Sequence, residues 1–235
     1  MPYVKVNDIN LYYQRTGAGE PLVFINGLSS DISEWQGLSL SLSRKYDFIA
    51  IDNRGAGRSD KPDIRYTIEM MANDVAGVLD SLGVKNANIL GLSMGGRIAV
   101  ALALSRPELV KSLVLVSTRM KRSKQHGWIH RLRLNLFSRS KARGSQQYPQ
   151  AYYAFKRQWA ASGSYDATAR LHKLRKPTLI LHGKDDPLVP YKLAKEMHES
   201  IEGSKIIMFN GGHLFFVGQF REFIETITDF LVSLN

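Results

Sequence analysis

The stretch Ala87-Asn88-Ile89-Leu90-Gly91-Leu92-Ser93-Met94-Gly95-Gly96 decides the fold of this chain. It joins a short apolar run, typical of a buried strand, to a helical pattern over Gly95–Ser105 through the motif Gly-x-Ser-x-Gly. So tight a turn strains the backbone of Ser93 and lifts its hydroxyl above the edge of the sheet. Glycine at positions 91 and 95 leaves room for strand and helix to cross closely. The stretch therefore predicts a strand–turn–helix unit with a serine hydroxyl at the sheet edge.

The same alternation of apolar runs and helical patterns continues outward in both directions. We expect eight strands, at Tyr3–Val6, Ile9–Gln14, Pro21–Ile25, Phe48–Ile51, Ala87–Leu90, Leu113–Val116, Thr178–Leu181 and Lys205–Phe209. We expect helices at Thr67–Leu82, Gly95–Ser105, Lys192–Glu199 and Phe220–Leu234. The first two strands flank an Asn7-Asp8 turn and predict a hairpin, whereas the later runs are apolar enough to be buried on both faces. This pattern predicts an α/β fold with a mostly parallel eight-stranded sheet and flanking helices.

One segment interrupts the alternation. Residues 119–172 contain no good strand and are rich in tyrosine, tryptophan and basic residues. We predict that they form a short helical lid inserted between two parts of one core, residues 1–118 and 173–235.

The charge of the chain is concentrated in the same region. The formal net charge is +11, and residues 119–176 hold fifteen Lys and Arg against a single acid, Asp166. A field of that sign would steer an anionic partner towards this surface, although a solvated basic face is an equally good interpretation. No nucleic-acid-binding motif accompanies the basic residues, so we predict no nucleic-acid partner.

Composition excludes several classes of site. The chain has no cysteine, which rules out disulfides, thiolate metal ligands and cysteine nucleophiles. No metal-ligand cluster appears, and Gly55-Ala56-Gly57 lacks the third glycine of a dinucleotide site, so we predict neither metal nor cofactor. No apolar run approaches the ~18 residues of a membrane span, and the N-terminus lacks the apolar core of a signal peptide. We therefore expect a cytoplasmic protein without a membrane span.

A serine hydroxyl needs a neighbouring base and an acid that orients the base. His213 follows the last predicted strand in a glycine-containing loop, at the sheet edge where open α/β sheets bind ligands. His182, at the end of the seventh strand, is the reserve candidate. The loop after that strand offers two acids, Asp185 and Asp186, and these residues alone do not decide between them.

The motifs together resemble those of the α/β-hydrolase superfamily, in its branch of small lidded esterases, lactonases and haloperoxidase-like enzymes. The resemblance covers nearly the whole chain outside the lid. It rests on the stretches Gly91–Gly96, Asp52–Pro62, Gly183–Pro190 and Gly211–His213. It implies Ser93, Asp186 and His213 as a catalytic triad, because the family's acid stands three residues after the glycine of the loop.

The resemblance also implies an oxyanion hole. Its two donors are the backbone amides of Leu28 and Met94. Relatives usually have histidine where this chain has Asn26, so Asn26 must replace the hydrogen bonds of that imidazole.

These features predict a serine hydrolase that cleaves a small-molecule carboxylic ester, thioester or lactone through an acyl-enzyme. One alternative is an esterase of the biotin-synthesis type that acts on acyl-carrier-protein esters, with the acidic carrier docked on Arg131, Arg133, Lys156 and Arg157. A lyase or cofactor-free haloperoxidase or perhydrolase, and a non-catalytic ligand-binding protein, are further alternatives. Candidate substrate-binding residues are Asn26, Trp35, Arg97, Trp128, Tyr153 and Trp159.

Overall fold

The computed structural model describes residues 2–122 and 147–234. A single eight-stranded sheet runs through them in the order β1-β2-β4-β3-β5-β6-β7-β8. The strands are β1 (Tyr3–Val6), β2 (Ile9–Thr16), β3 (Glu20–Ile25), β4 (Tyr46–Ile51), β5 (Ala87–Leu92), β6 (Val110–Val116), β7 (Thr178–Gly183) and β8 (Lys205–Phe209). β2 pairs antiparallel with β1 and β4, and all other pairs are parallel. The predicted mostly parallel eight-stranded sheet is confirmed.

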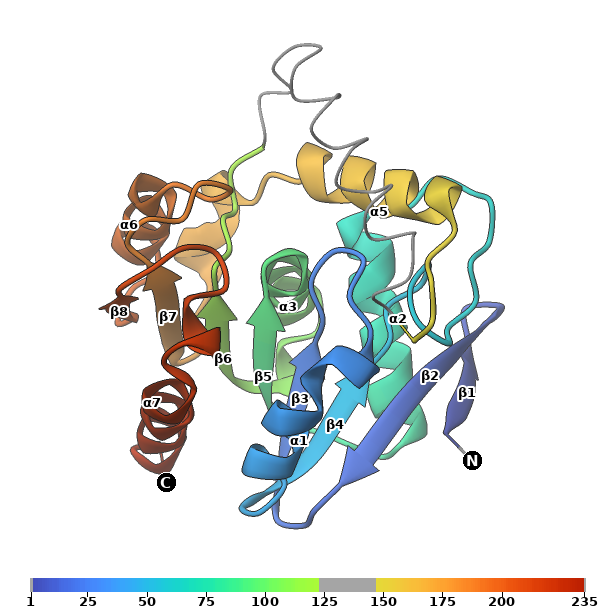
Figure 1. Ribbon diagram of the computed structural model, residues 1–235, viewed down its shortest axis with the longest axis horizontal. Coiled ribbons are helices and arrows are strands. Elements are labelled where there is room, and N and C mark those ends of the chain that lie inside the picture. Colours follow the sequence, from blue (N-terminus) through green and yellow to red (C-terminus); the bar gives the residue numbers. More distant parts are fainter. Residues whose placement is uncertain (1, 123–146, 235) are drawn as a thin grey trace.

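Helices cover both faces of this sheet (Figure 1). The helices α2 (Ile68–Ser81), α3 (Met94–Ser105) and α6 (Tyr191–Ser200) contribute to one apolar core, whereas α1 (Gln36–Leu42) and α7 (Phe220–Val232) contribute to the other. Successive strand residues point to opposite faces, so that in β3 Val23 and Ile25 join the first core and Leu22 and Phe24 the second. This explains why these strands are continuously apolar.

Helix α1 was not predicted from the sequence. Its residues, Gln-Gly-Leu-Ser-Leu-Ser-Leu, alternate with the period of a strand. In the structure Leu38 and Leu42 are buried one helical turn apart, while Leu40 points outward and is 68% exposed. Packing of one leucine pair therefore decides a conformation that the local pattern leaves open.

Strand β6 starts three residues earlier than its apolar run predicts. The added residues include Lys111 and Ser112, which are polar but have partners on other strands of the sheet. Lys111 pairs with Glu20, and the Ser112 hydroxyl donates to Oδ1 of Asn88 at 2.6 Å. Hydrogen bonding satisfies these side chains inside the sheet, which a hydrophobicity pattern cannot anticipate.

Part of the predicted lid lies in the described residues. Helix α5 (Tyr152–Ser164) and a short 3₁₀ helix (Thr168–Lys173) follow residue 147, and α5 lies beyond the C-terminal ends of the parallel strands (Figure 1). Residues 123–146, the centre of the predicted insertion, are outside the described residues. The division into two core parts and a lid stays a prediction.

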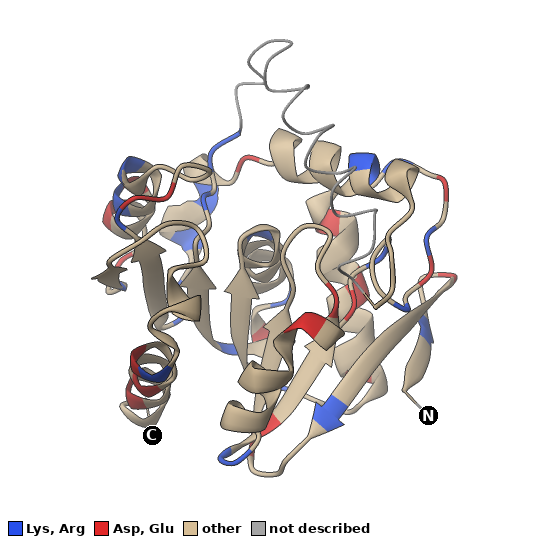
Figure 2. Cartoon of the chain, in the orientation of Figure 1, with Lys and Arg blue, Asp and Glu red and all other residues tan. Residues whose placement is uncertain are grey.

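Basic and acidic residues are both spread over the described helices, strands and loops (Figure 2). No helix within residues 2–122 and 147–234 has the length and apolar character needed to cross a membrane.

Candidate active site

Ser93 occupies the turn between β5 and α3. Its φ of 53° lies in the left-handed region, which residues other than glycine rarely adopt. A Cβ on Gly95 would lie 2.0 Å from the carbonyl oxygen of Ile25, and a Cβ on Gly91 would lie 2.6 Å from the carbonyl oxygen of Gly95. Both glycines are therefore required by close backbone approach, and the strained turn holds the Ser93 side chain above the sheet.

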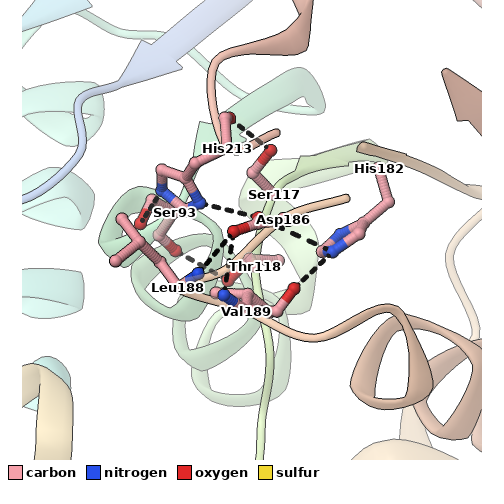
Figure 3. Close-up of polar contacts among 8 residues, drawn as sticks. All are labelled: Ser93, Ser117, Thr118, His182, Asp186, Leu188, Val189 and His213. Carbon is pink, nitrogen blue, oxygen red and sulfur yellow. Dashed lines mark hydrogen bonds and ion pairs between the residues drawn. The ribbon is translucent and has the colours of Figure 1, made fainter. Parts of the chain in front are cut away.

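Three side chains meet at this turn (Figure 3). The Ser93 Oγ lies 3.1 Å from Nε2 of His213, and Nδ1 of the same imidazole lies 2.7 Å from Oδ2 of Asp186. A carboxylate that accepts Nδ1–H fixes the tautomer in which Nε2 can take a proton. The arrangement is thus a hydroxyl, a base and an orienting acid within hydrogen-bond distance of one another.

The surroundings of Asp186 keep it ionised. The side chain is fully buried, and its Oδ1 accepts the backbone amides of Leu188 at 2.8 Å and Val189 at 2.9 Å. Burial alone would raise the pKa of Asp186, but the hydrogen bond from His213 and the two amides together lower it below its ordinary value. The neighbouring Asp185 is exposed, so the structure brings Asp186 and not Asp185 to the imidazole.

The two loops that carry the acid and the base pack directly on each other. A Cβ on Gly183 would lie 2.2 Å from the carbonyl oxygen of Gly212, so glycine allows the loops after β7 and β8 to approach. This contact brings Asp186 and His213 together although they lie 27 residues apart in the chain.

Two residues that the sequence analysis did not select hold the backbone of this group. The Ser117 hydroxyl donates to the carbonyl oxygen of His213 at 2.8 Å, and the Thr118 hydroxyl donates to that of Ser93 at 2.6 Å. Both are buried and follow β6 directly. Their position at the carboxyl end of a central parallel strand is the sequence signal that could have found them.

His182, the reserve base, does not face Ser93. It is buried, and its Nε2 lies 2.8 Å from the carbonyl oxygen of Val189. The imidazole therefore holds the loop around Asp186 instead of the serine hydroxyl.

The loop after β3 lies against the Ser93 turn. A Cβ on Gly27 would lie 3.7 Å from the Cβ of Ser93. The amides of Leu28 and Met94, the predicted oxyanion donors, donate to no other group of the described residues, and Met94 begins α3, whose first amides have no partner within the helix. Both amides are thus uncommitted within the described residues, as the predicted role of oxyanion donors requires.

Asn26 has a role in the loop itself. It is buried, and its Nδ2 donates to the carbonyl oxygen of Ile51 at 2.9 Å. Its backbone carbonyl oxygen accepts a hydrogen bond from Nδ2 of Asn53 at 3.0 Å. Asn26 thus joins the ends of β3 and β4, and this contact favours a structural role over direct substrate binding.

The other candidate substrate-binding residues have varied surroundings. Trp35 donates Nε1–H to Oγ of Ser30 and packs edge-on against Phe24 at a centroid distance of 5.3 Å. Arg97 is buried and donates to the carbonyl oxygens of Arg119 and Ser162. Its pKa is lowered to about 9, chiefly by burial and by the nearby Arg119.

Neither of these contacts aims Trp35 or Arg97 at the serine. Tyr153 and Trp159 lie on α5, where the Tyr153 hydroxyl donates to the carbonyl oxygen of Lys61 at 2.5 Å and Trp159 is half-buried. Trp128 is outside the described residues. Among residues 2–122 and 147–234, no three His, Asp or Glu side chains gather where they could hold a metal ion.

Comparisons with known proteins identify the family and the fold. The sequence profile of the family described as alpha/beta hydrolase fold matches residues 20–133 and 118–219. The chain is 30% identical to a putative carbamate hydrolase, RutD, of Azorhizobium caulinodans over 92% of each chain. It is 28% identical to the 2-hydroxy-6-oxo-2,4-heptadienoate hydrolase of Pseudomonas putida, over 92% of this chain and 91% of that one. An esterase from Exiguobacterium antarcticum superposes with a TM-score of 0.84 at 25% identity, over 97% of this chain and 98% of the esterase.

Proposed function

Since the chain belongs to the α/β-hydrolase fold family, we propose that it is a serine hydrolase that cleaves a carboxylic ester or lactone with Ser93, His213 and Asp186. The single observation that carries this proposal is the chain of contacts from Ser93 Oγ to His213 Nε2 and from His213 Nδ1 to Asp186 Oδ2. A hydroxyl, an imidazole and a carboxylate in this order are the parts that nucleophilic acyl transfer requires.

In the proposed reaction Ser93 Oγ attacks the acyl carbon while Nε2 of His213 takes its proton. The amides of Leu28 and Met94 bind the oxyanion of the tetrahedral intermediate. His213 then gives the proton to the leaving oxygen, and the alcohol departs from an acyl-enzyme. Water then attacks the acyl carbon and loses a proton to His213, and His213 returns this proton to Ser93 Oγ as the bond between Oγ and the acyl carbon breaks and the acid leaves.

The relatives are named for different substrates, which include a carbamate, 2-hydroxy-6-oxo-2,4-heptadienoate and an ester. They support a hydrolytic enzyme that acts on a small molecule. The choice of ester or lactone is our inference, because an acyl-enzyme and an oxyanion pocket suffice for these substrates without further groups.

The prediction of an acidic carrier-protein partner is based only on the basic segment. Of the four basic residues that we assigned to it, Arg131 and Arg133 lie outside the described residues. Arg157 is paired with Asp63 at 2.5 Å, and Lys156 lies over the ring of Tyr152 at 4.9 Å. Neither of the described residues favours docking of an acidic carrier.

A fluorophosphonate probe tests the proposal, because it forms a covalent bond only with an activated serine. We expect labelling of the wild-type protein, none of Ser93→Ala, and unchanged labelling of Ser105→Ala. Ser105 is a matched control, because it ends the same helix and its hydroxyl donates only to carbonyl oxygens of that helix. A panel of p-nitrophenyl esters, lactones and aryl carbamates then measures the preferred bond.

Turnover of the best ester should fall by a factor on the order of 10⁶ in Ser93→Ala. Equal labelling or equal ester turnover of wild type and Ser93→Ala would overturn the proposal.

A further inference from the structure

A buried glutamine connects helix α5 to the loop that carries the proposed oxyanion donor. Gln158, in the middle of α5, has no exposed surface. Its Oε1 accepts the backbone amide of Ser29 at 3.0 Å, and its Nε2 donates to the carbonyl oxygen of Arg54 at 2.8 Å. The side chain thus contacts two core loops that lie 104 and 129 residues away in the chain.

A second glutamine fixes the orientation of that amide group. Nε2 of Gln150 donates to Oε1 of Gln158 at 2.9 Å and to the carbonyl oxygen of Gly55 at 2.6 Å. Since Oε1 accepts two N–H groups and Nε2 faces a carbonyl oxygen, a flip of the Gln158 amide would place like groups against each other. The contact with Ser29 is therefore determined by the network and does not depend on one bond.

Ser29 immediately follows Leu28, and its strained backbone must be stabilised by contacts from outside the loop. Its φ of 62° is in the left-handed region, which costs a residue with a side chain of order 1 kcal/mol or more. The peptide before Leu28 is held on the other side, because the Gly27 carbonyl accepts the amide of Ser30 at 3.4 Å. Gln158 and Ser30 thus fix the peptide groups on both sides of Leu28, and with them the direction of its N–H.

We propose that Gln158 is a positioning residue that aligns the Leu28 amide for the oxyanion. This inference rests on the proposed function, which makes Leu28 an oxyanion donor. It adds that the oxyanion loop reaches its active geometry only while α5 is seated on the core. Gln158 acts through Ser29, not through contact with the substrate.

The decisive variant is Gln158→Met, which keeps the length of the side chain and removes its acceptor. An oxyanion donor that is lost outright lowers kcat about 10²–10³-fold, so a misaligned one should lower kcat roughly tenfold or more. KM for a short ester should stay within about twofold, because the oxyanion forms only in the transition state. The rate of fluorophosphonate labelling should fall in proportion to kcat, since the phosphonyl oxygen occupies the same place.

Two further variants separate positioning from mere stability. Gln158→Glu retains an acceptor for the Ser29 amide but sets its second oxygen against the carbonyl oxygen of Arg54, so it should recover only part of the kcat that Gln158→Met loses. Gln158→Asn retains the amide group but is shorter by one methylene, so it should lose kcat as Gln158→Met does, and it serves if the methionine variant does not fold. Ser162→Ala is the matched control on α5: its hydroxyl accepts Nη1 of Arg97 at 2.8 Å, far in sequence from the oxyanion loop, and its loss should leave kcat within about twofold.

A folded Gln158→Met or Gln158→Asn protein with wild-type kcat and labelling rate would overturn this inference. If Ser93-dependent ester turnover persisted in that experiment, the proposed function would stand while the role of Gln158 fell. Loss of kcat in Ser162→Ala equal to that in Gln158→Met would likewise overturn it, because any loosening of α5 would then have the same effect.

Discussion

The Nε2 atom of His182 lies 3.7 Å from Oδ2 of Asp186, so the carboxylate that contacts His213 has a second imidazole beside it (Figure 3). This distance is too long for a hydrogen bond, and Nε2 donates instead to the carbonyl oxygen of Val189. Burial lowers the pKa of His182 below its ordinary value of 6.5. This effect outweighs the hydrogen bond with the Val189 carbonyl and the charge of the Asp186 carboxylate, which both raise the pKa. The second imidazole is accordingly neutral and acts by holding the loop around Asp186.

Replacement of His182 with phenylalanine should therefore destabilise the protein. The buried Val189 carbonyl would lose its donor, at a cost of about 1–3 kcal/mol in the free energy of unfolding at pH 7.5. Urea unfolding measures this change. His198→Phe is the matched control: its imidazole contacts only the Ser204 hydroxyl at a less buried site, and we expect a smaller loss.

The same variant predicts a pH effect with a definite sign. A histidine whose pKa is lower in the folded than in the unfolded state contributes its full stability above 6.5, and loses it as the pH falls through the folded-state pKa. The difference in unfolding free energy between wild type and His182→Phe should thus shrink as the pH falls below 6.5. A difference that grows on acidification would show that His182 is charged in the native state.

Gly95→Ala should disrupt the Ser93 turn. The new Cβ would meet the carbonyl oxygens of Ile25 at 2.0 Å and Asn26 at 2.7 Å, and neither backbone atom can move without shifting β3. We expect a loss of about 1–3 kcal/mol or more in unfolding free energy, together with loss of ester turnover. Gly218→Ala, where nothing lies within 4 Å of the added Cβ and φ is −84°, should leave both quantities unchanged. Thermal unfolding of the two variants side by side would contradict this account if their midpoints agreed.

The sequence predicted the sheet and the reacting residues for the same reason. Strands buried on both faces leave continuous apolar runs, and a turn as crowded as that around Ser93 admits glycine at fixed positions. Such local constraints are visible in a single sequence. The residues that were missed act through tertiary contacts. Thr118 contacts Ser93 from the loop after β6, and Gln158 contacts Ser29, which lies 129 positions away in the chain. A polar side chain does not reveal its partner until the chain is folded.

Asp186 shows the limit of what the sequence alone could predict about the site. The loop after β7 offered two adjacent acids with equal local patterns, and family resemblance was needed to prefer one of them. In the structure the choice follows from burial, because Asp186 turns inward under two backbone amides whereas Asp185 is exposed. Likewise Arg97 was a candidate substrate-binding residue, but its guanidinium group is directed to Ser162 near the end of α5.

The ion pair of Arg54 with Asp74 should be costly to break. Its side chains are only 3% and 4% exposed, and Nη2 of Arg54 lies 2.6 Å from Oδ1 of Asp74. Arg54→Leu would leave a buried carboxylate without its cation, at a cost of about 3–5 kcal/mol in unfolding free energy. The double variant Arg54→Leu, Asp74→Leu should recover much of that loss, because no charge stays buried. Chemical unfolding of the single and double variants tests this, and equal instability of both would refute it.

The carboxylate of Asp52 lies at the end of β4, directly against the backbone of Gly57. The side chain is buried, and its two oxygens accept the amides of Ile32 at 2.8 Å and Arg58 at 2.9 Å. Burial nevertheless dominates and raises the pKa of Asp52 to about 6, while the two amides lower it by less. The native protein thus binds a proton on this group under conditions in which the unfolded chain has released it.

A group with a raised pKa stabilises the fold fully below the unfolded value, near 3.8, and loses that contribution as the pH rises through about 6. Asp52→Asn removes the titration but keeps the shape of the side chain. The unfolding free energy of wild type minus that of Asp52→Asn should therefore fall between pH 4 and pH 7, by on the order of 2–3 kcal/mol. The variant carries a constant offset, because its amide group can accept only one of the two backbone N–H groups. The pH dependence of the difference is thus the informative quantity, and urea unfolding at several pH values measures it while the effect of His182 cancels. A difference that stayed level from pH 4 to pH 7 would mean that the carboxyl group is ionised throughout, and that its two amide bonds outweigh its burial.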